Sequence, residues 1–268
     1  MFLKLDNTKF LNADEIKRSA PSVFTKTAFD SLSNKYTHIP TSQVIEDMAK
    51  LNFFVTECKE IKARKRVGFQ KHLLIFRNPD LVINGADGDT VYPTILISNS
   101  HDGSSSFIFQ SGIFRAICSN GLVVSTQDFD KLKIRHMNYT FEELQDKIKF
   151  MVEQLPLTVE SMNKMKSTQL SEDQARDLAK RSLTTRFDED EIDALNIDLD
   201  ALLEPTRPED KPNDLFTVFN RIQEKILGGD FSYMTGTKIR KARKVKNFQQ
   251  DIKINAHLYA IASEFVEA

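Results

Sequence analysis

Cysteine and long apolar runs are scarce in this sequence of 268 residues. It contains two cysteines, Cys58 and Cys118, which are too few for a disulfide framework and favour a reducing compartment. The first ten residues carry Lys4, Asp6 and Lys9 and contain no apolar run of signal-peptide length. No uninterrupted apolar stretch reaches the roughly 18 residues that a membrane-spanning helix needs. We therefore expect a cytoplasmic protein that has no membrane partner.

Signatures of nucleotide and metal chemistry are missing as well. Neither GxxxxGKS/T nor GxGxxG occurs, so we expect neither nucleotide hydrolysis nor dinucleotide binding. The two cysteines and five histidines show no paired ligand spacing such as CxxC or HxxxH. The sequence therefore predicts no metal site and no cofactor. The formal net charge is −1, so no global field marks the chain as a nucleic-acid binder.

Runs rich in aromatic and β-branched residues characterise the middle of the N-terminal half. Four such runs, residues 53–61, 72–76, 91–98 and 107–118, are separated by short polar segments with turn chemistry. No helix-length crossover lies between them, so they predict an antiparallel sheet and argue against a parallel Rossmann-type sheet. One helix is expected before the sheet, with Thr41 as its capping residue.

Beyond about residue 140 the apolar spacing becomes helical. Two pairs of residues have the spacing of a capping box, and each predicts the start of a helix. These pairs are Thr140 with Glu143 and Ser171 with Gln174. A further helix is expected to begin after Asn213 or Asp214 and to stop at Gly228–Gly229, and another helix ends the chain.

The sequence as a whole predicts an α+β fold. An antiparallel sheet with one early helix occupies the N-terminal half, and a mainly helical C-terminal half follows. The predicted regions are the sheet region 1–139, a helical region 140–204, a linker 205–213 with three prolines, and C-terminal helices 214–268 with a basic segment. The helical region includes an acidic block, residues 188–204, with eight acids and no base. We expect these regions to form one compact unit.

Several stretches share the motifs of a known family. The two main ones read NSHDGSSS at residues 99–106 and SGIFRAICSNGLV at residues 111–123. Further agreement lies in Ala20–Ser22, Tyr36, Ile39–Thr41, Phe219–Glu224, Gly228–Gly229, Arg243–Lys246 and Asn255. Together they resemble a family that is carried by phages, plasmids and integrated mobile elements and is known only as a domain of unknown function. That context favours DNA handling, or interference with host defence, over metabolism.

The family motif admits a chemical and a structural interpretation. His101 beside Asp102 could act as an acid/base pair or contact a phosphate, and Cys118 could be a nucleophile with His101 or His136 as its base. We favour turn building for Asp102–Gly103 and a small buried side chain for Cys118. The motif positions, interpreted as structural, are His101, Asp102, Gly103, Arg115, Cys118, Asn120 and Gly121.

Two basic stretches are the most informative feature for function. Residues 59–77 hold seven cations against Glu60 alone, with aromatic side chains interleaved, and residues 238–246 hold six cations and no acid. Cations beside aromatic rings suit single-stranded nucleic acid, with Phe69 or Tyr92 stacking on bases, whereas the alternative is a pair of solvated loops. The residues assigned to nucleic-acid binding are Lys62, Arg64, Lys65, Arg66, Phe69, Lys71, Arg77, Lys238, Arg240, Lys241, Arg243, Lys244 and Lys246.

Three functions stay open at this point. The leading hypothesis is a nucleic-acid-handling protein that binds or anneals single-stranded DNA without covalent chemistry, so no catalytic residue is assigned. The second is an interaction protein that inhibits a host defence or repair factor through the acidic block 188–204. The third is a metal-dependent nuclease, because Glu57 and Lys59 form an E-x-K pair on a predicted strand. The sequence leaves homo-oligomerisation undecided.

Overall fold

The computed structural model describes residues 9–81, 83–84, 90–115, 121–124, 133–137 and 140–266. The sequence indicated one compact unit, whereas the chain divides into two units that alternate along the sequence. Unit 1 comprises residues 1–83, 92–112 and 126–155. Unit 2 comprises residues 84–91, 113–125 and 156–268. The fold is α+β, as predicted, with a sheet in the N-terminal half and a mostly helical C-terminal half.

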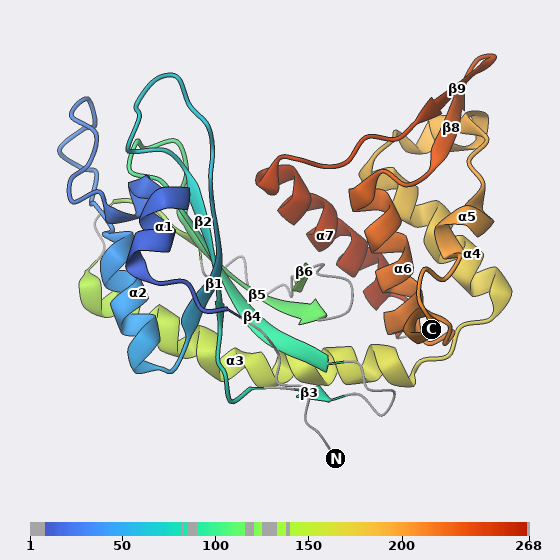
Figure 1. Ribbon diagram of the computed structural model, residues 1–268, viewed down its shortest axis with the longest axis horizontal. Coiled ribbons are helices and arrows are strands. Elements are labelled where there is room, and N and C mark those ends of the chain that lie inside the picture. The colour runs from blue at the N-terminus through green and yellow to red at the C-terminus, as the bar shows by residue number, and fades with distance from the viewer. Residues whose placement is uncertain are drawn as a thin grey trace. The chain divides into compact units, whose positions relative to one another are not determined.

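The sheet has the strand order β1-β2-β4-β5-β6, with β3 beside β4 (Figure 1). A further strand, β7, pairs with β5. The strands are β1 (Phe54–Glu60), β2 (His72–Arg77), β3 (Ile83–Asn84), β4 (Thr90–Asn99), β5 (Phe107–Arg115), β6 (Gly121–Val124) and β7 (Lys133–Ile134). The four longest coincide with the four predicted runs to within a few residues. β1 pairs antiparallel with β2, and β2 pairs antiparallel with β4. The antiparallel prediction is therefore confirmed.

The core of unit 1 lies on one face of this sheet. Alternate residues of a strand point to the same face, and this alternation places Leu74 and Phe76 of β2 and Ile95 and Ile97 of β4 in the core. Phe107 and Phe109 of β5 are also fully buried. The helices α1 (Ala13–Ser19) and α2 (Thr41–Lys50) pack against β1 (Figure 1).

Helix α1 was not predicted, although its signal was present. Asn12 accepts a hydrogen bond from the backbone N–H of Glu15, and the Glu15 side chain accepts one from the backbone N–H of Asn12. This is a capping box with the same spacing that located the helices of the C-terminal half. A short 3-10 helix, η1 (Pro21–Phe24), follows α1.

Helix α2 begins at Thr41, but the Thr41 side chain does not cap it, so that prediction was wrong. No side-chain hydrogen bond caps this helix. The Thr41 hydroxyl lies instead 2.9 Å from Nε2 of His72 and accepts a hydrogen bond of 2.8 Å from Nδ2 of Asn99. All three side chains are fully buried. A buried hydroxyl that connects two polar side chains is held there because leaving either partner unpaired costs free energy.

We expect Thr41→Val to destabilise the protein more than Thr41→Ser does. Valine keeps the shape but removes the hydroxyl that pairs with His72 Nε2 among the described residues, at a cost of about 1–3 kcal/mol for a buried unsatisfied group. Serine keeps the hydroxyl and loses a buried methyl, which costs about 1 kcal/mol. Urea unfolding of the two variants beside the wild type measures this order. Equal midpoints for the wild type and Thr41→Val would contradict the role assigned to the hydroxyl.

The remaining helices are α3 (Phe141–Ser167), α4 (Glu172–Ser182), α5 (Leu199–Leu203), α6 (Leu215–Gly228) and α7 (Phe248–Ser263), with the 3-10 helices η3 (Leu183–Thr185), η4 (Glu189–Leu195) and η5 (Pro208–Asp210). Of these, α3, α4 and α6 begin at the predicted starts and α7 is the predicted last helix, whereas no start was predicted for α5 or for the 3-10 helices. Both predicted capping boxes, at Thr140 and at Ser171, are formed. Asp214 caps α6 through the backbone N–H of Thr217, and Gly229 ends α6 with a φ of 73°. None of the described helices is long and apolar enough to cross a membrane.

Two parts of unit 2 differ from the sequence-based expectation. Residues 232–241 form a hairpin of β8 (Ser232–Thr235) and β9 (Lys238–Lys241), which was not predicted (Figure 1). The proline-containing segment 205–213, expected as a linker, lies inside unit 2 and includes η5. Arg207 pairs there with Glu224 at 2.7 Å and with Asp210, which is 2% exposed. These contacts hold the segment in place.

Candidate nucleic-acid interface

A pocket of about 510 Å³ lies beside the β8–β9 hairpin of unit 2. We call it the hairpin pocket, and it is lined by Arg186, Phe187, Tyr233, Arg240, Lys241 and Arg243. Four of these side chains are cations and two are aromatic. Three of the cations belong to the basic segment 238–246, and Arg186 and Phe187 come from the segment that follows α4. Arg186, Phe187 and Tyr233 were not predicted as site residues, because none of them stands out in its own part of the chain.

Hydrogen bonds to backbone carbonyls fix the guanidinium of Arg186 in this pocket. It donates to the carbonyl of Ile226 at 2.5 Å and to the carbonyl of Arg243 at 2.9 Å. Burial lowers the pKa of Arg186 below its ordinary value, but an arginine keeps its charge at neutral pH. The hydrogen bond to Arg243 also connects the segment after α4 with the basic segment 238–246. Arg186 thus supplies a positioned positive charge.

The two aromatic rings of the hairpin pocket lie next to each other. Phe187 and Tyr233 make an edge contact with their centroids 5.0 Å apart and their planes at 62°. Both side chains are half-buried, so part of each ring surface is accessible. A base can stack on such a partly exposed ring whatever its identity, because every base has a π-face.

The other cations of the basic segment are exposed. β9 is exposed along its whole length, and Arg240 lies opposite Tyr233 in the hairpin register. Lys241 lies 3.8 Å from Asp230, which is a loose, solvated ion pair. Lys238, Lys244 and Lys246 are exposed as well. This segment therefore presents its charge to solvent, as binding to phosphates requires.

The second basic stretch lies in unit 1, in the loop between β1 and β2. Lys62, Arg64 and Lys65 are exposed there. Arg66 makes contacts within the protein. It donates a hydrogen bond to the carbonyl of Asp102 at 2.8 Å, and its guanidinium carbon lies 5.2 Å from the ring centre of Phe29. Phe69 is half-buried and makes an edge contact with Phe29, with their ring centres 5.3 Å apart.

Arg77 and Tyr92 do not fit an exposed interface. Arg77 is 4% exposed and Tyr92 is 6% exposed. The guanidinium carbon of Arg77 lies 5.0 Å from the ring centre of Tyr92, so each side chain packs on the other inside the sheet region. The sequence showed their charge and aromaticity but not their burial. We remove both from the proposed interface.

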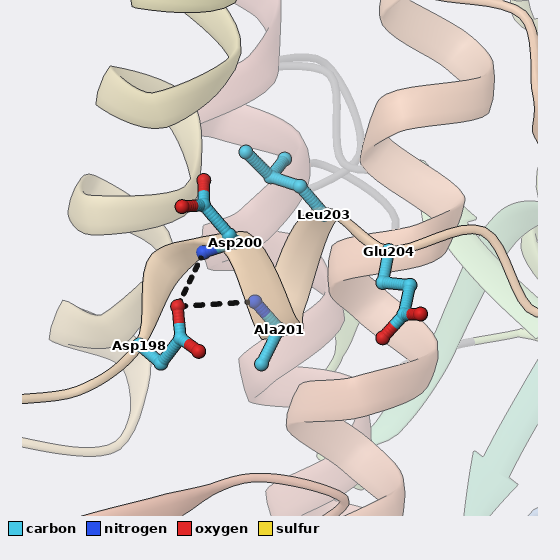
Figure 2. A pocket seen from close by; sticks show the side chains of 5 residues that line it. All are labelled: Asp198, Asp200, Ala201, Leu203 and Glu204. Carbon is cyan, nitrogen blue, oxygen red and sulfur yellow. Dashed lines mark hydrogen bonds between the residues drawn. The ribbon is translucent and has the colours of Figure 1, made fainter.

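The acidic block 188–204 is folded onto α4 of the same unit. Its Asp193 lies 2.7 Å from Lys180, and its Asp200 pairs with Arg176. Its apolar side chains Ile192 and Leu202 are buried. A pocket of about 400 Å³ lies in this block. Figure 2 shows the Asp198 carboxylate there pointing at the backbone N–H groups that begin α5. Some of the acidic side chains thus form ion pairs within unit 2.

The E-x-K pair lies on β1, where the Glu57 carboxylate and the Lys59 ammonium group are 3.8 Å apart. A nuclease metal site needs further carboxylates beside the first. Within the described ranges, no group of three or more histidine, cysteine, aspartate or glutamate side chains could hold a metal ion.

The family motif NSHDGSSS forms the connection between β4 and β5. Gly103 has a φ of +76°, in the left-handed region that favours glycine, and Asp102 accepts a hydrogen bond from the backbone N–H of Ser104. Arg115 ends β5 and Gly121 begins β6. Cys118 and Asn120 lie outside the described residues.

His101 is the centre of a cluster of histidine rings that was not predicted from the sequence. We call His38, His72, His101 and His136 the histidine cluster; all four lie in unit 1. The ring centre of His101 lies 4.5 Å from that of His38 and 5.2 Å from that of His72. These residues are more than 25 positions apart from one another in the sequence. Only the fold brings them together.

Burial sets the protonation of the histidine cluster. It lowers the pKa of His72 to about 4, and burial together with the neighbouring histidines lowers the pKa of His101 to about 2. Burial also lowers the pKa of His38 and of His136. The cluster is therefore neutral near pH 7.

Comparison with known proteins places the chain in a family. Residues 28–259 match the family model described as a domain of unknown function (DUF932). The chain belongs to the DUF932 family. The matched range includes every residue that lines the hairpin pocket and every member of the histidine cluster.

Two similar relatives come from Escherichia coli (strain K12). They are the UPF0380 protein YfjQ and the UPF0380 protein YafZ. Each is 31% identical to this chain over 255 residues, which cover 94% of this chain and 90% of the relative. No solved structure matches the chain.

Proposed function

We propose that this DUF932 protein is a nucleic-acid-handling protein of mobile elements that binds single-stranded DNA without covalent chemistry. The observation that carries the proposal is the hairpin pocket, where four cations surround two partly accessible aromatic rings. Cations neutralise phosphates, and aromatic rings offer stacking surfaces to bases. In a duplex the base faces are already stacked, so this combination favours a single strand.

A fluorescence-polarisation titration of a labelled oligonucleotide at several salt concentrations tests the proposal. Affinity should fall steeply with salt, because each neutralised phosphate releases condensed counterions. For a single strand the logarithm of affinity should change by about −0.7 per contact for each unit of log salt. The double variant Arg240→Ala, Arg243→Ala should therefore flatten the slope by roughly 1.4 if both side chains contact phosphates.

The matched control removes two exposed cations of unit 2 that lie outside the pocket. Lys211→Ala with Lys253→Ala makes the same change in net charge and should leave the slope unchanged. Tyr233→Leu should lower affinity by about 1–3 kcal/mol, the value of one stacked base, with little effect on the salt slope. The contributions of charge and of base stacking to DNA affinity are thus measured separately in one assay.

The loop of unit 1 is tested in the same way. Lys62, Arg64 and Lys65 are exposed, and replacing all three with alanine should flatten the slope by roughly two units if each contacts a phosphate. Arg66 is not mutated in this test. Its side chain donates a hydrogen bond to the carbonyl of Asp102, so replacing it would also disturb the folded loop.

The same titration also separates the alternatives. Absence of binding at low salt would refute the proposal and favour a protein partner of the acidic block 188–204. Cleavage of the oligonucleotide in the presence of Mg²⁺ would favour the nuclease hypothesis and Glu57. Binding that does not respond to salt would mean that the basic segments are ordinary surface.

A further inference from the structure

A second pocket of about 510 Å³ lies within unit 1, at the loop formed by the family motif. We call it the serine pocket. Side chains from four separate segments line it, and those that matter here are Tyr36, Lys71, Ser104–Ser106, Arg135 and His136. It shares no residue with the hairpin pocket. The inference that follows is therefore independent of the proposed binding to single-stranded DNA.

The charge of the serine pocket is positive. Among the described residues that line it, Lys71 and Arg135 are cations and none is a carboxylate. Arg135 is exposed, so its guanidinium can reach a ligand at the pocket mouth. Arginine and lysine side chains beside several hydroxyl groups are the usual surroundings of a bound phosphate.

The serine loop is held in a fixed shape before any ligand binds. The Asp102 carboxylate accepts a hydrogen bond from the backbone N–H of Ser104 at 2.9 Å, and the Ser100 hydroxyl accepts one from the backbone N–H of Ser105 at 3.1 Å. The Ser105 hydroxyl also donates to the Ser100 hydroxyl at 3.1 Å. A preformed loop reduces the entropy lost on binding.

His136 lines this pocket, and one of its ring nitrogens is a buried acceptor. The residue is 6% exposed, and its ring stacks on the ring of Tyr36 with centroids 4.7 Å apart and planes at 12°. Its Nδ1 lies 3.1 Å from the carbonyl of Thr37, so Nδ1 carries the proton of the neutral ring. Its Nε2 is buried and has no hydrogen-bond partner in the part of the chain that the structure describes. Burial lowers the pKa of His136, so Nε2 accepts rather than donates near pH 7.

We infer that the serine pocket binds a small phosphorylated ligand that also carries a hydroxyl group, the chemistry shared by nucleotides and sugar phosphates. Lys71, Arg135 and the hydroxyl of Ser106 hold the phosphate. A hydroxyl of the ligand donates to Nε2 of His136 and satisfies that buried acceptor. The volume of about 510 Å³ falls in the range of small-molecule sites.

Isothermal titration calorimetry on the full chain, with no DNA present, tests this inference. The probes are ribose 5-phosphate, adenosine 5′-monophosphate, inorganic phosphate and ribose. We expect each phosphorylated sugar to bind at least about tenfold more tightly than inorganic phosphate or ribose alone, because only it satisfies both parts of the site. Tighter binding of adenosine 5′-monophosphate than of ribose 5-phosphate would assign the ligand as a nucleotide. Equal binding would assign it as a sugar phosphate.

Two variants locate the site. Arg135→Gln should weaken binding by about tenfold or more, the loss expected for a charge-assisted hydrogen bond. The matched control, Lys17→Gln, removes an exposed cation of α1 in the same unit and should bind as the wild type does. His136→Phe keeps an aromatic ring on Tyr36 and should abolish the preference for the phosphorylated sugar over inorganic phosphate. If that variant fails to fold, Ser106→Ala replaces it and should weaken every phosphorylated probe.

Three results would overturn the inference. One is no binding of either phosphorylated sugar at millimolar concentration. Another is equal weakening by Arg135→Gln and Lys17→Gln. The third is inorganic phosphate binding to the wild type as tightly as ribose 5-phosphate, which would leave His136 without a role.

Discussion

Acidification from pH 7 to pH 5 should cost this protein roughly 4 kcal/mol of unfolding free energy through His72 and His101 alone. In the unfolded chain a histidine has a pKa of about 6.5. In the folded chain the pKa is about 4 for His72 and about 2 for His101. Between pH 6.5 and pH 4 the unfolded state therefore binds protons that the folded state does not. Stability is complete above about pH 6.5 and is lost as the pH falls below it.

The test is urea unfolding at several pH values between 5 and 7, on the wild type and on His101→Leu. His101 suits this change because neither ring nitrogen makes a hydrogen bond of normal geometry with the described residues. Leucine should be tolerated at pH 7 and should reduce the slope of stability against pH by about 1.4 kcal/mol per pH unit, the contribution of one proton. Parallel curves for the two proteins would show that His101 takes up a proton in the folded state.

Replacing Gly229 with alanine should destabilise the protein strongly, for two separate reasons. Gly229 has a φ of +73°, which costs about 1–3 kcal/mol for a residue with a side chain. A Cβ there would also lie 2.5 Å from the carbonyl carbon of Arg243 and 2.8 Å from the carbonyl oxygen of Ala242. Backbone atoms cannot move aside as side-chain atoms can, so the overlap adds about 1–3 kcal/mol.

Gly236 provides the matched control for this prediction. Its φ is +60°, but a Cβ there would meet nothing within 4 Å. Gly236→Ala should therefore show the conformational cost alone, and Gly229→Ala should show that cost plus the overlap. Thermal unfolding measures both. We also expect Gly229→Ala to weaken binding to single-stranded DNA, because the displaced segment after β9 carries Arg243 of the hairpin pocket. Equal destabilisation by the two variants would contradict the close backbone approach.

Local signals in the sequence located most of the elements correctly. The capping residues Ser171 and Asp214 mark helix starts because their side chains satisfy backbone N–H groups only a few residues away. The strands were predictable from residue type and turn chemistry. Thr41 is the counterexample: its capping chemistry was real, but a distant partner, His72, takes its hydroxyl.

Features that depend on distant contacts were not predictable. The burial of Arg77 against Tyr92 follows from how β2 and β4 pair, which no local pattern encodes. The histidine cluster arises for the same reason. The hairpin pocket shows an intermediate case, because its cations in 238–246 were visible in the sequence while Arg186 and Phe187 join them only through the fold.

The alternation of the two units along the chain has a genetic consequence. The chain passes from one unit to the other after residues 83, 91, 112, 125 and 155, so neither unit is encoded by one continuous stretch. A deletion or a recombination event that removed residues 156–268 would also leave residues 84–91 and 113–125 without the rest of their unit. A single crossover therefore cannot exchange the hairpin pocket or the serine pocket together with a whole unit.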